Sequence, residues 1–254
     1  MISWLLCILL LNFLCGSTGY PPHRPISIAT LVPADERRLF SIKRVSPAIA
    51  IAIDKVTAKD GILPYSIINV KYRDSQCSIA DAMNEAINYY VKKEADVLFG
   101  PCCDYAAAPI ARQTRYWNLP MVTPGAMARD FAIRKKNMFP LLTRMGANFD
   151  SLVDFLVSML NHFGWSKVNI VYHPDGQSYV VERFCHVATD GIHYGMRARK
   201  GLHNFTQDYF KFDYDSEIVE QMKEELGREF AGVREQFCDE SMPKITNTHI
   251  LHLT

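Results

Sequence analysis

Short apolar runs alternate with segments of helical periodicity along most of the chain. Strands are predicted at residues 26–32, 66–72, 97–99 and 120–123. Apolar residues recur at helical spacing between them, at residues 45–56, 79–91 and 106–117. Pro47 is tolerable in the first turn of the first of these helices. Strands separated by helices of this length indicate right-handed βαβ units, so we predict an α/β fold with a parallel sheet flanked by helices.

A second series of the same kind starts near residue 141. Leu152, Leu156, Met159 and Phe163 share one face of a predicted helix, and a β-branched strand follows at residues 168–172. Further elements are predicted as helices at 179–192 and 218–226, a loop at 230–246 and the start of another parallel strand at 250–253. We therefore expect a first lobe at residues 20–145, a crossover near residues 141–151, and the start of a second lobe, incomplete, at residues 146–254.

The first nineteen residues are typical of a secretory signal peptide. The apolar run at residues 4–15 is too short to span a bilayer, and small residues at Ser17 and Gly19 favour cleavage before Tyr20. A retained anchor is the alternative. The sequence Asn204-Phe205-Thr206 is a glycosylation acceptor in a secreted chain. We expect the secretory pathway and an extracellular or cell-surface location, with no transmembrane helix in this chain.

Cysteine count and charge restrict the class further. Five of the seven cysteines remain after removal of the signal: Cys77, Cys102, Cys103, Cys185 and Cys238. In an oxidising compartment an odd number implies two bridges and one remaining thiol. The net charge of +1 and the short, interleaved basic pairs such as Lys135-Lys136, interpreted as solvated, argue against nucleic acid as a partner. The cysteine spacing predicts no metal site.

The segment at residues 97–117 contains the candidate binding site and two of the cysteines. A strand, a tight turn with two cysteines and a helix follow one another there. Backbone N–H groups in the first turn of a helix have no intrahelical partner, so this turn is a candidate anion or ligand site. Either cysteine of the turn could be tied to Cys77 at the end of the preceding strand.

The sequence GPCCDYAAAPIAR at residues 100–112 resembles the extracellular ligand-binding domain of natriuretic peptide receptors, with membrane guanylyl cyclases among them. Other similar pieces are LFS at 39–41, RVSPAI at 44–49, DSQC at 74–77, WNLPM at 117–121, LTR at 142–144, GWS at 164–166, and Cys185 with Asp190-Gly191. The resemblance implies a two-lobed fold like that of periplasmic binding proteins, of which this chain is an N-terminal fragment. It also implies that a receptor homodimer binds a peptide hormone.

The resemblance implies pairings and an ion as well. Cys77 would pair with Cys103, and a structural chloride ion would be held by the Ser75 hydroxyl and the N–H groups of Cys102 and Cys103; Ser75 capping the turn is the alternative. Cys102 departs from the family, which has a small or apolar residue there. The family's partner for Cys185 falls at Thr254, so Cys238 is the substitute.

Four residues are candidate peptide contacts by resemblance: Asp104, Tyr105, Arg112 and Asp190. The alternatives from local pattern are a capping carboxylate for Asp104, a surface cation for Arg112, and a helix C-cap followed by a turn for Asp190-Gly191. Tyr116 is placed on a dimer surface by the same resemblance.

Three functions are considered for this chain. The first is the hormone-binding region of a natriuretic-peptide-receptor-like protein, of the guanylyl-cyclase-coupled or the clearance type. This region is not itself an enzyme, although a parent receptor could carry a cyclase domain. The second is a secreted hormone-binding decoy without signalling. The third is an exported thiol enzyme using Cys102 or Cys103. The sequence contains no nucleophile elbow, dinucleotide-binding glycine motif or paired-histidine zinc helix.

Overall fold

The structure is a computed structural model that describes residues 24–199 and 206–212, positions 220 and 224, and the pairs 231–232 and 252–253. The predicted signal peptide, the cleavage position before Tyr20, the glycosylation acceptor Asn204 and Cys238 lie outside the described residues. So do most of the predicted helix at 218–226 and most of the predicted loop at 230–246.

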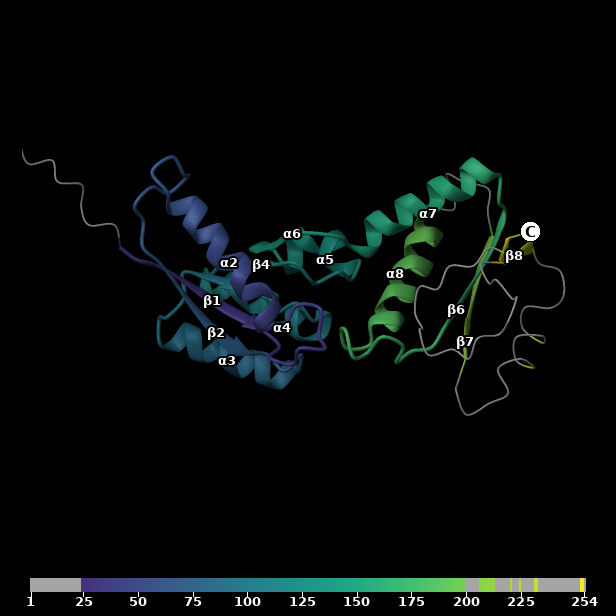
Figure 1. Ribbon diagram of the computed structural model, residues 1–254. Coiled ribbons are helices and arrows are strands. Elements are labelled where there is room, and N and C mark those ends of the chain that lie inside the picture. The colour runs from purple at the N-terminus through teal and green to yellow at the C-terminus, as the bar shows by residue number, and fades with distance from the viewer. Residues whose placement is uncertain are drawn as a thin grey trace, which may run out of the picture.

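The first lobe is built on a five-stranded sheet in the order β2-β1-β3-β4-β5, in which every pair is parallel (Figure 1). Its strands are β1 (Ile26–Val32), β2 (Ile68–Asp74), β3 (Val97–Phe99), β4 (Met121–Thr123) and β5 (Leu142–Arg144). The expected α/β fold is confirmed. Strand β5 lies in what the sequence suggested was a crossover, and only the first of its three residues is fully buried, which is too little pattern to identify a strand.

Three helices connect the strands of the first lobe: α2 (Ile42–Thr57), α3 (Ile79–Val91) and α4 (Asp104–Trp117). Helix α2 begins three residues earlier than predicted, because the Ser41 carbonyl accepts from the N–H groups of Arg44 and Val45. Pro47 is therefore inside the helix and not in its first turn. Helices α3 and α4 bury alanines in the core of the lobe, whereas α2, on the other side of the sheet, has no fully buried residue (Figure 1).

The chain passes to the second lobe through β5 and two short helices, α5 (Asp130–Ile133) and α6 (Lys135–Met138). The second lobe contains α7 (Phe149–Phe163), β6 (Lys167–Tyr172), α8 (Phe184–Arg199), β7 (Thr206–Lys211), β8 (Ala231–Gly232) and β9 (His252–Leu253). Its strands follow the order β7-β6-β9-β8. Strands β6 and β7 are parallel, but β9 is antiparallel to both β6 and β8, so the expected parallel strand at 250–253 is wrong.

Helix α8 differs from its prediction in where it starts and in the role of its glycines. It starts at Phe184, and Asp190-Gly191 lies in its middle, so the predicted C-cap and turn are wrong. A Cβ atom on Gly191 would lie 2.8 Å from Cβ of Phe149, and one on Gly195 would lie 2.7 Å from Cγ2 of Val153. The glycines are present because α7 and α8 pack too closely for a side chain, and they do not end the helix.

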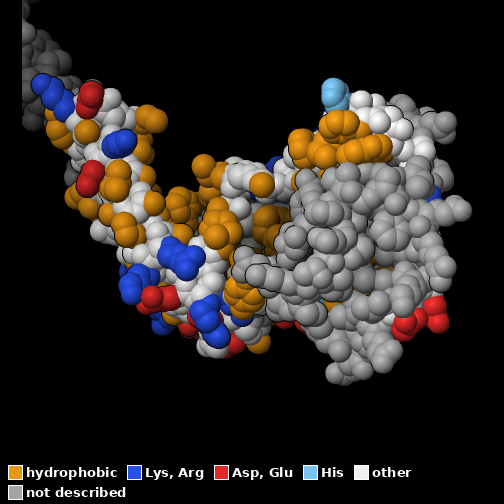
Figure 2. Space-filling view, turned by 45° about the vertical axis from the view of Figure 1, so that its right-hand side comes forward, with side chains coloured by type: hydrophobic (Ala, Val, Ile, Leu, Met, Phe, Trp, Pro, Cys, Tyr) orange, Lys and Arg blue, Asp and Glu red, His pale blue; other side chains and the backbone are white. Residues whose placement is uncertain are grey.

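The surface of the first lobe carries mixed charge. On the face shown in Figure 2, Lys and Arg side chains lie beside Asp and Glu side chains, and the surface is hollowed between the two lobes. Within the described part of the chain, no helix combines the length and the apolar character that crossing a membrane requires.

Candidate functional site

The carboxyl ends of β1, β3 and β4 form the edge of the first sheet that meets the second lobe. Gly100 has φ +85°, and a Cβ there would lie 2.0 Å from the Leu31 carbonyl oxygen, so only glycine fits. A Cβ on Gly125 would lie 1.9 Å from the Cys102 carbonyl oxygen. The Thr123 hydroxyl donates to the Pro101 carbonyl at 2.7 Å. The turns after β3 and β4 are therefore closed against each other.

A disulfide ties this edge to the turn after β2. Cys77 and Cys103 are bonded, with 5.5 Å between their Cα atoms, and both are buried. Gln76 and Cys77 adopt positive φ, and a carboxylate oxygen of Asp74 accepts from the N–H groups of Gln76 and Ala34 at 2.8 Å each. This is the pairing that the resemblance implies. Cys185 is also disulfide-bonded, and its predicted partner lies outside the described residues.

Cys102 is a free and buried thiol at the same turn. Its Sγ lies 3.9 Å from that of Cys103, and burial raises the pKa of the Cys102 thiol to about 12. The thiol is thus protonated at neutral pH, which gives no support to a nucleophilic role.

The backbone N–H groups of Cys102 and Cys103 are two of the groups that the resemblance assigns to a chloride ion. The same turn holds the buried Cys102 thiol, and the third predicted group, the fully buried Ser75 hydroxyl, accepts from the Cys77 N–H at 3.4 Å, a bond that does not use the hydroxyl's own hydrogen. The chloride ion at these donors therefore stays a prediction.

Asp104 is the first residue of α4, but it does not lie on the surface. The residue is 6% exposed, and its carboxylate accepts from the Ala128 N–H at 2.7 Å. Burial raises the pKa of Asp104 to about 6, although the Ala128 N–H and the charge of Arg144 oppose this shift. Asp104 thus holds the segment after β4. The same segment is linked to the second lobe, since the Met127 carbonyl accepts a hydrogen bond from the Phe149 N–H at the start of α7.

The segment between β6 and α8 returns to the first lobe. Arg38 donates from Nη1 to the Ser178 carbonyl at 2.8 Å. Val181 is 1% exposed and belongs to the hydrophobic core of the first lobe. The two lobes therefore share buried contacts at their junction.

A rim of aromatic and charged side chains borders this junction. The Arg183 guanidinium carbon lies 6.0 Å from the centroid of the half-buried Tyr105 ring. Burial raises the pKa of the Tyr172 hydroxyl. The nearby Asp190 carboxylate raises this pKa further, whereas the Arg183 guanidinium lowers it. The Asp190 side chain is 56% exposed and lies 3.7 Å from Nε2 of His186. We call Tyr105, Tyr172, Arg183, His186 and Asp190 the junction rim.

The structure brings Tyr105 and Asp190 into this rim but separates Arg112 from it. Arg112 is exposed seven residues further along α4, about 10 Å along the helix axis, with its guanidinium 5.6 Å from the Phe139 ring centroid. Tyr116 is 71% exposed, and Trp117 stacks on Tyr90 at 4.9 Å. Lys135 is not simply solvated, because its ammonium group donates to the Leu142 carbonyl.

The sequence pattern did not indicate a role for Arg38, Val181 or Arg183. A helix predicted from residue 179 would distribute residues 179–183 around a helical surface, whereas the chain there is irregular and Arg183 has a positive φ. The pair Val180-Val181 is the one signal that could have indicated a buried contact in this segment.

Residues 44–208 match the family described as "Receptor family ligand binding region". The chain belongs to this receptor family. It is 31% identical to human "Atrial natriuretic peptide receptor 3" over 208 residues, which are 78% of this chain and 36% of the human protein. It is 31% identical to rat "Atrial natriuretic peptide receptor 2" over 173 residues, which are 67% of this chain and 16% of the rat protein. The receptor-family chain thus spans about a third of the length of the human receptor 3 and about a sixth of the length of the rat receptor 2.

A solved structure shares the fold of the receptor-family chain. An ABC transporter substrate-binding protein from Desulfitobacterium hafniense superimposes with a TM-score of 0.61 and 14% identity, covering 80% of this chain and 56% of that one. This likeness to a substrate-binding protein confirms the expected fold class.

Proposed function

We propose that this chain is the extracellular, non-catalytic region of a receptor that binds a peptide hormone of the natriuretic type. The observation that carries the proposal is the family match over residues 44–208 together with relatives named as atrial natriuretic peptide receptors. The chain would reach the cell surface through the secretory pathway. The complete receptor would be a homodimer, with the exposed Tyr116 on the dimer surface.

The junction rim has the chemistry that such a peptide needs. The exposed Asp190 carboxylate suits an arginine of the hormone, because Arg–carboxylate pairs are strong and directional. Arg183 and Tyr105 offer a donor for peptide carbonyls and an aromatic face for apolar side chains. Arg112 would contact a different part of an extended peptide, further along α4. Asp104 would act by holding the segment after β4, since it is buried.

Binding of a fluorescent, disulfide-ringed natriuretic peptide to the secreted chain tests the proposal. We expect Asp190→Asn to weaken binding by about 1–3 kcal/mol, the range for a lost charge-assisted hydrogen bond. Arg183→Ala should weaken it as well. Asp130→Asn is the matched control, because Asp130 is an equally exposed carboxylate on α5 in the first lobe. If no variant differs from the parent, or if the parent does not bind the peptide, the proposed function is wrong.

A further inference from the structure

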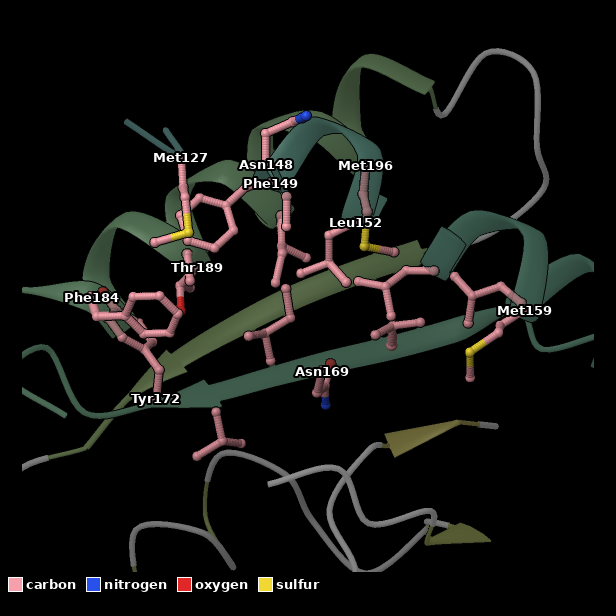
Figure 3. Close-up of a pocket in the computed structure, with 18 of the residues that line it drawn as sticks. Met127, Asn148, Phe149, Leu152, Met159, Asn169, Tyr172, Phe184, Thr189 and Met196 are labelled. Carbon is pink, nitrogen blue, oxygen red and sulfur yellow. The ribbon is translucent and has the colours of Figure 1, made fainter. Parts of the chain in front are cut away.

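The second lobe contains a cavity of about 300 Å³ between its helix layer and strand β6. Figure 3 shows this space running from Phe184 and Met127 at one end to Met159 at the other, with Leu152 and Met196 above it and β6 below. Protein interiors are close-packed and contain few voids larger than a water molecule. A cavity of this size is therefore a feature that needs an explanation.

The packing of the helix layer explains why the space exists. Gly191 and Gly195 let α8 approach α7 so closely that a Cβ on either glycine would clash with Phe149 or Val153. These two glycines thus serve the contact with α7, whereas Ala188 and Thr189 of the same helix line the cavity. Leu152 and Met159 of α7 are only partly buried, although they point across the cavity toward the strand (Figure 3).

The lining defines which molecules could enter. Among the described residues that line the cavity none is charged, so an ionised group inside it would lose its hydration without a partner. Three methionines, Met127, Met159 and Met196, supply flexible and polarisable surfaces that adapt to irregular shapes. Thr189 points from α8 into the space, and Asn169 points to the other side of β6 (Figure 3).

The size of the cavity limits the ligand further. At about 30 Å³ for each water-sized group, 300 Å³ holds about ten non-hydrogen atoms. Binding pockets for small molecules begin at about this volume. Met127 comes from the segment after β4 that Asp104 holds, so an occupant would contact elements of both lobes.

We propose that this cavity is a binding site for a neutral, mostly apolar molecule of about ten non-hydrogen atoms, such as a medium-chain alcohol, whose single polar group bonds to the Thr189 hydroxyl. Tyr172 belongs both to the junction rim and to the cavity lining, but the proposal does not depend on hormone binding.

Quenching of Trp165 fluorescence by 8-bromo-1-octanol tests the proposal, because Trp165 lines the cavity and bromine quenches tryptophan at contact. The Trp117→Phe background leaves Trp165 as the emitting tryptophan of residues 20–254. We expect saturable quenching by the alcohol. The ionised 8-bromooctanoate, of the same length, should not quench saturably, since its carboxylate cannot be buried there. Absence of saturable quenching up to the solubility limit of the alcohol, or equal quenching by the carboxylate, would overturn the proposal.

Matched variants on α8 locate the site. Ala188→Leu fills the cavity and should weaken alcohol binding at least tenfold, whereas Ala198→Leu, on the exposed side of the same helix, should leave it unchanged. Thr189→Val keeps the shape and should weaken binding about 2- to 10-fold, the effect of one neutral hydrogen bond. Leu152→Phe is a second filling variant if Ala188→Leu does not fold. Unchanged binding in folded filling variants contradicts the proposed site, and unchanged binding in Thr189→Val contradicts the role of its hydroxyl.

Discussion

The two lobes share an α/β plan but use their small residues differently. In the first lobe, the alanines of α3 and α4 belong to the core, and the lobe also buries a carboxylate and a thiol. In the second lobe, the glycines of α8 face another helix, and a cavity remains above β6. The small residues of the first lobe thus take part in its core, whereas the glycines of the second lobe serve a helix–helix contact and space remains beside the sheet.

Removal of the disulfide in the first lobe should have the largest effect on stability. Cys77 and Cys103 are 26 residues apart, so removing the bridge with the double variant Cys77→Ala/Cys103→Ala should lower the free energy of unfolding by about 3–4 kcal/mol. Replacing both cysteines prevents Cys102 from forming a new bridge. Denaturant titration measures the change, and Cys102→Ala, which keeps the bridge, is the control. An unchanged unfolding midpoint in the double variant would show that the staple does not stabilise this lobe.

A pair of alanine-to-leucine variants tests the comparison directly. Ala107→Leu on α4 overfills the first core and should destabilise the protein by about 3 kcal/mol, because Ala107 is fully buried among close neighbours. Ala188→Leu on α8 should be tolerated or stabilising, because its side chain enters the cavity. Thermal and denaturant unfolding of both variants compares them. Equal destabilisation by the two substitutions would contradict the difference between the lobes.

The buried carboxylate predicts a pH dependence. The pKa of Asp104 is about 6 in the folded protein, above its ordinary value of 3.8, so its contribution to stability is full below pH 3.8 and is lost as the pH rises through 6. Asp104→Asn cannot ionise, yet its amide oxygen can still accept from Ala128. Relative to the parent, the variant should therefore gain about 2 kcal/mol between pH 4 and pH 7.5.

The measurement for Asp104 is the difference in unfolding free energy between variant and parent at each pH. The exposed Asp130, replaced by Asn, serves as the control in the same lobe. A difference between Asp104→Asn and the parent that stays constant from pH 4 to pH 7.5 would show that this carboxylate is not held in an unfavourable environment.

The smallest effect concerns the sulfur that fills the turn after β3. Cys102→Ala removes the buried Sγ atom from the turn and opens room for an anion near the N–H groups of residues 102 and 103. We expect chloride, compared with gluconate at equal ionic strength, to stabilise this variant by about 1 kcal/mol or less and to leave the parent unchanged. Chloride-specific stabilisation of the parent itself would show that the sulfur does not exclude the ion.

The sequence predicted the elements of the first lobe well because their hydrophobic pattern and their burial coincide. Strands β1 and β3 were placed residue for residue, and the Cys77–Cys103 pairing followed from resemblance. Local pattern could not reveal the meaning of Gly191, because a glycine that permits close helix packing looks the same as one that ends a helix. The burial of Asp104 and the position of Arg183 depend on segments far away along the chain.

Val181 shows that the boundary between the lobes differs between strand order and core packing. The chain can be divided at residue 145 by strand order, yet the core of the first sheet takes in a side chain from beyond β6. A protein cut at that boundary would have a hole where Val181 belongs and an Arg38 without its carbonyl partner. The boundary in strand order therefore does not coincide with the boundary of the first core, which takes in side chains as far along the chain as Phe184.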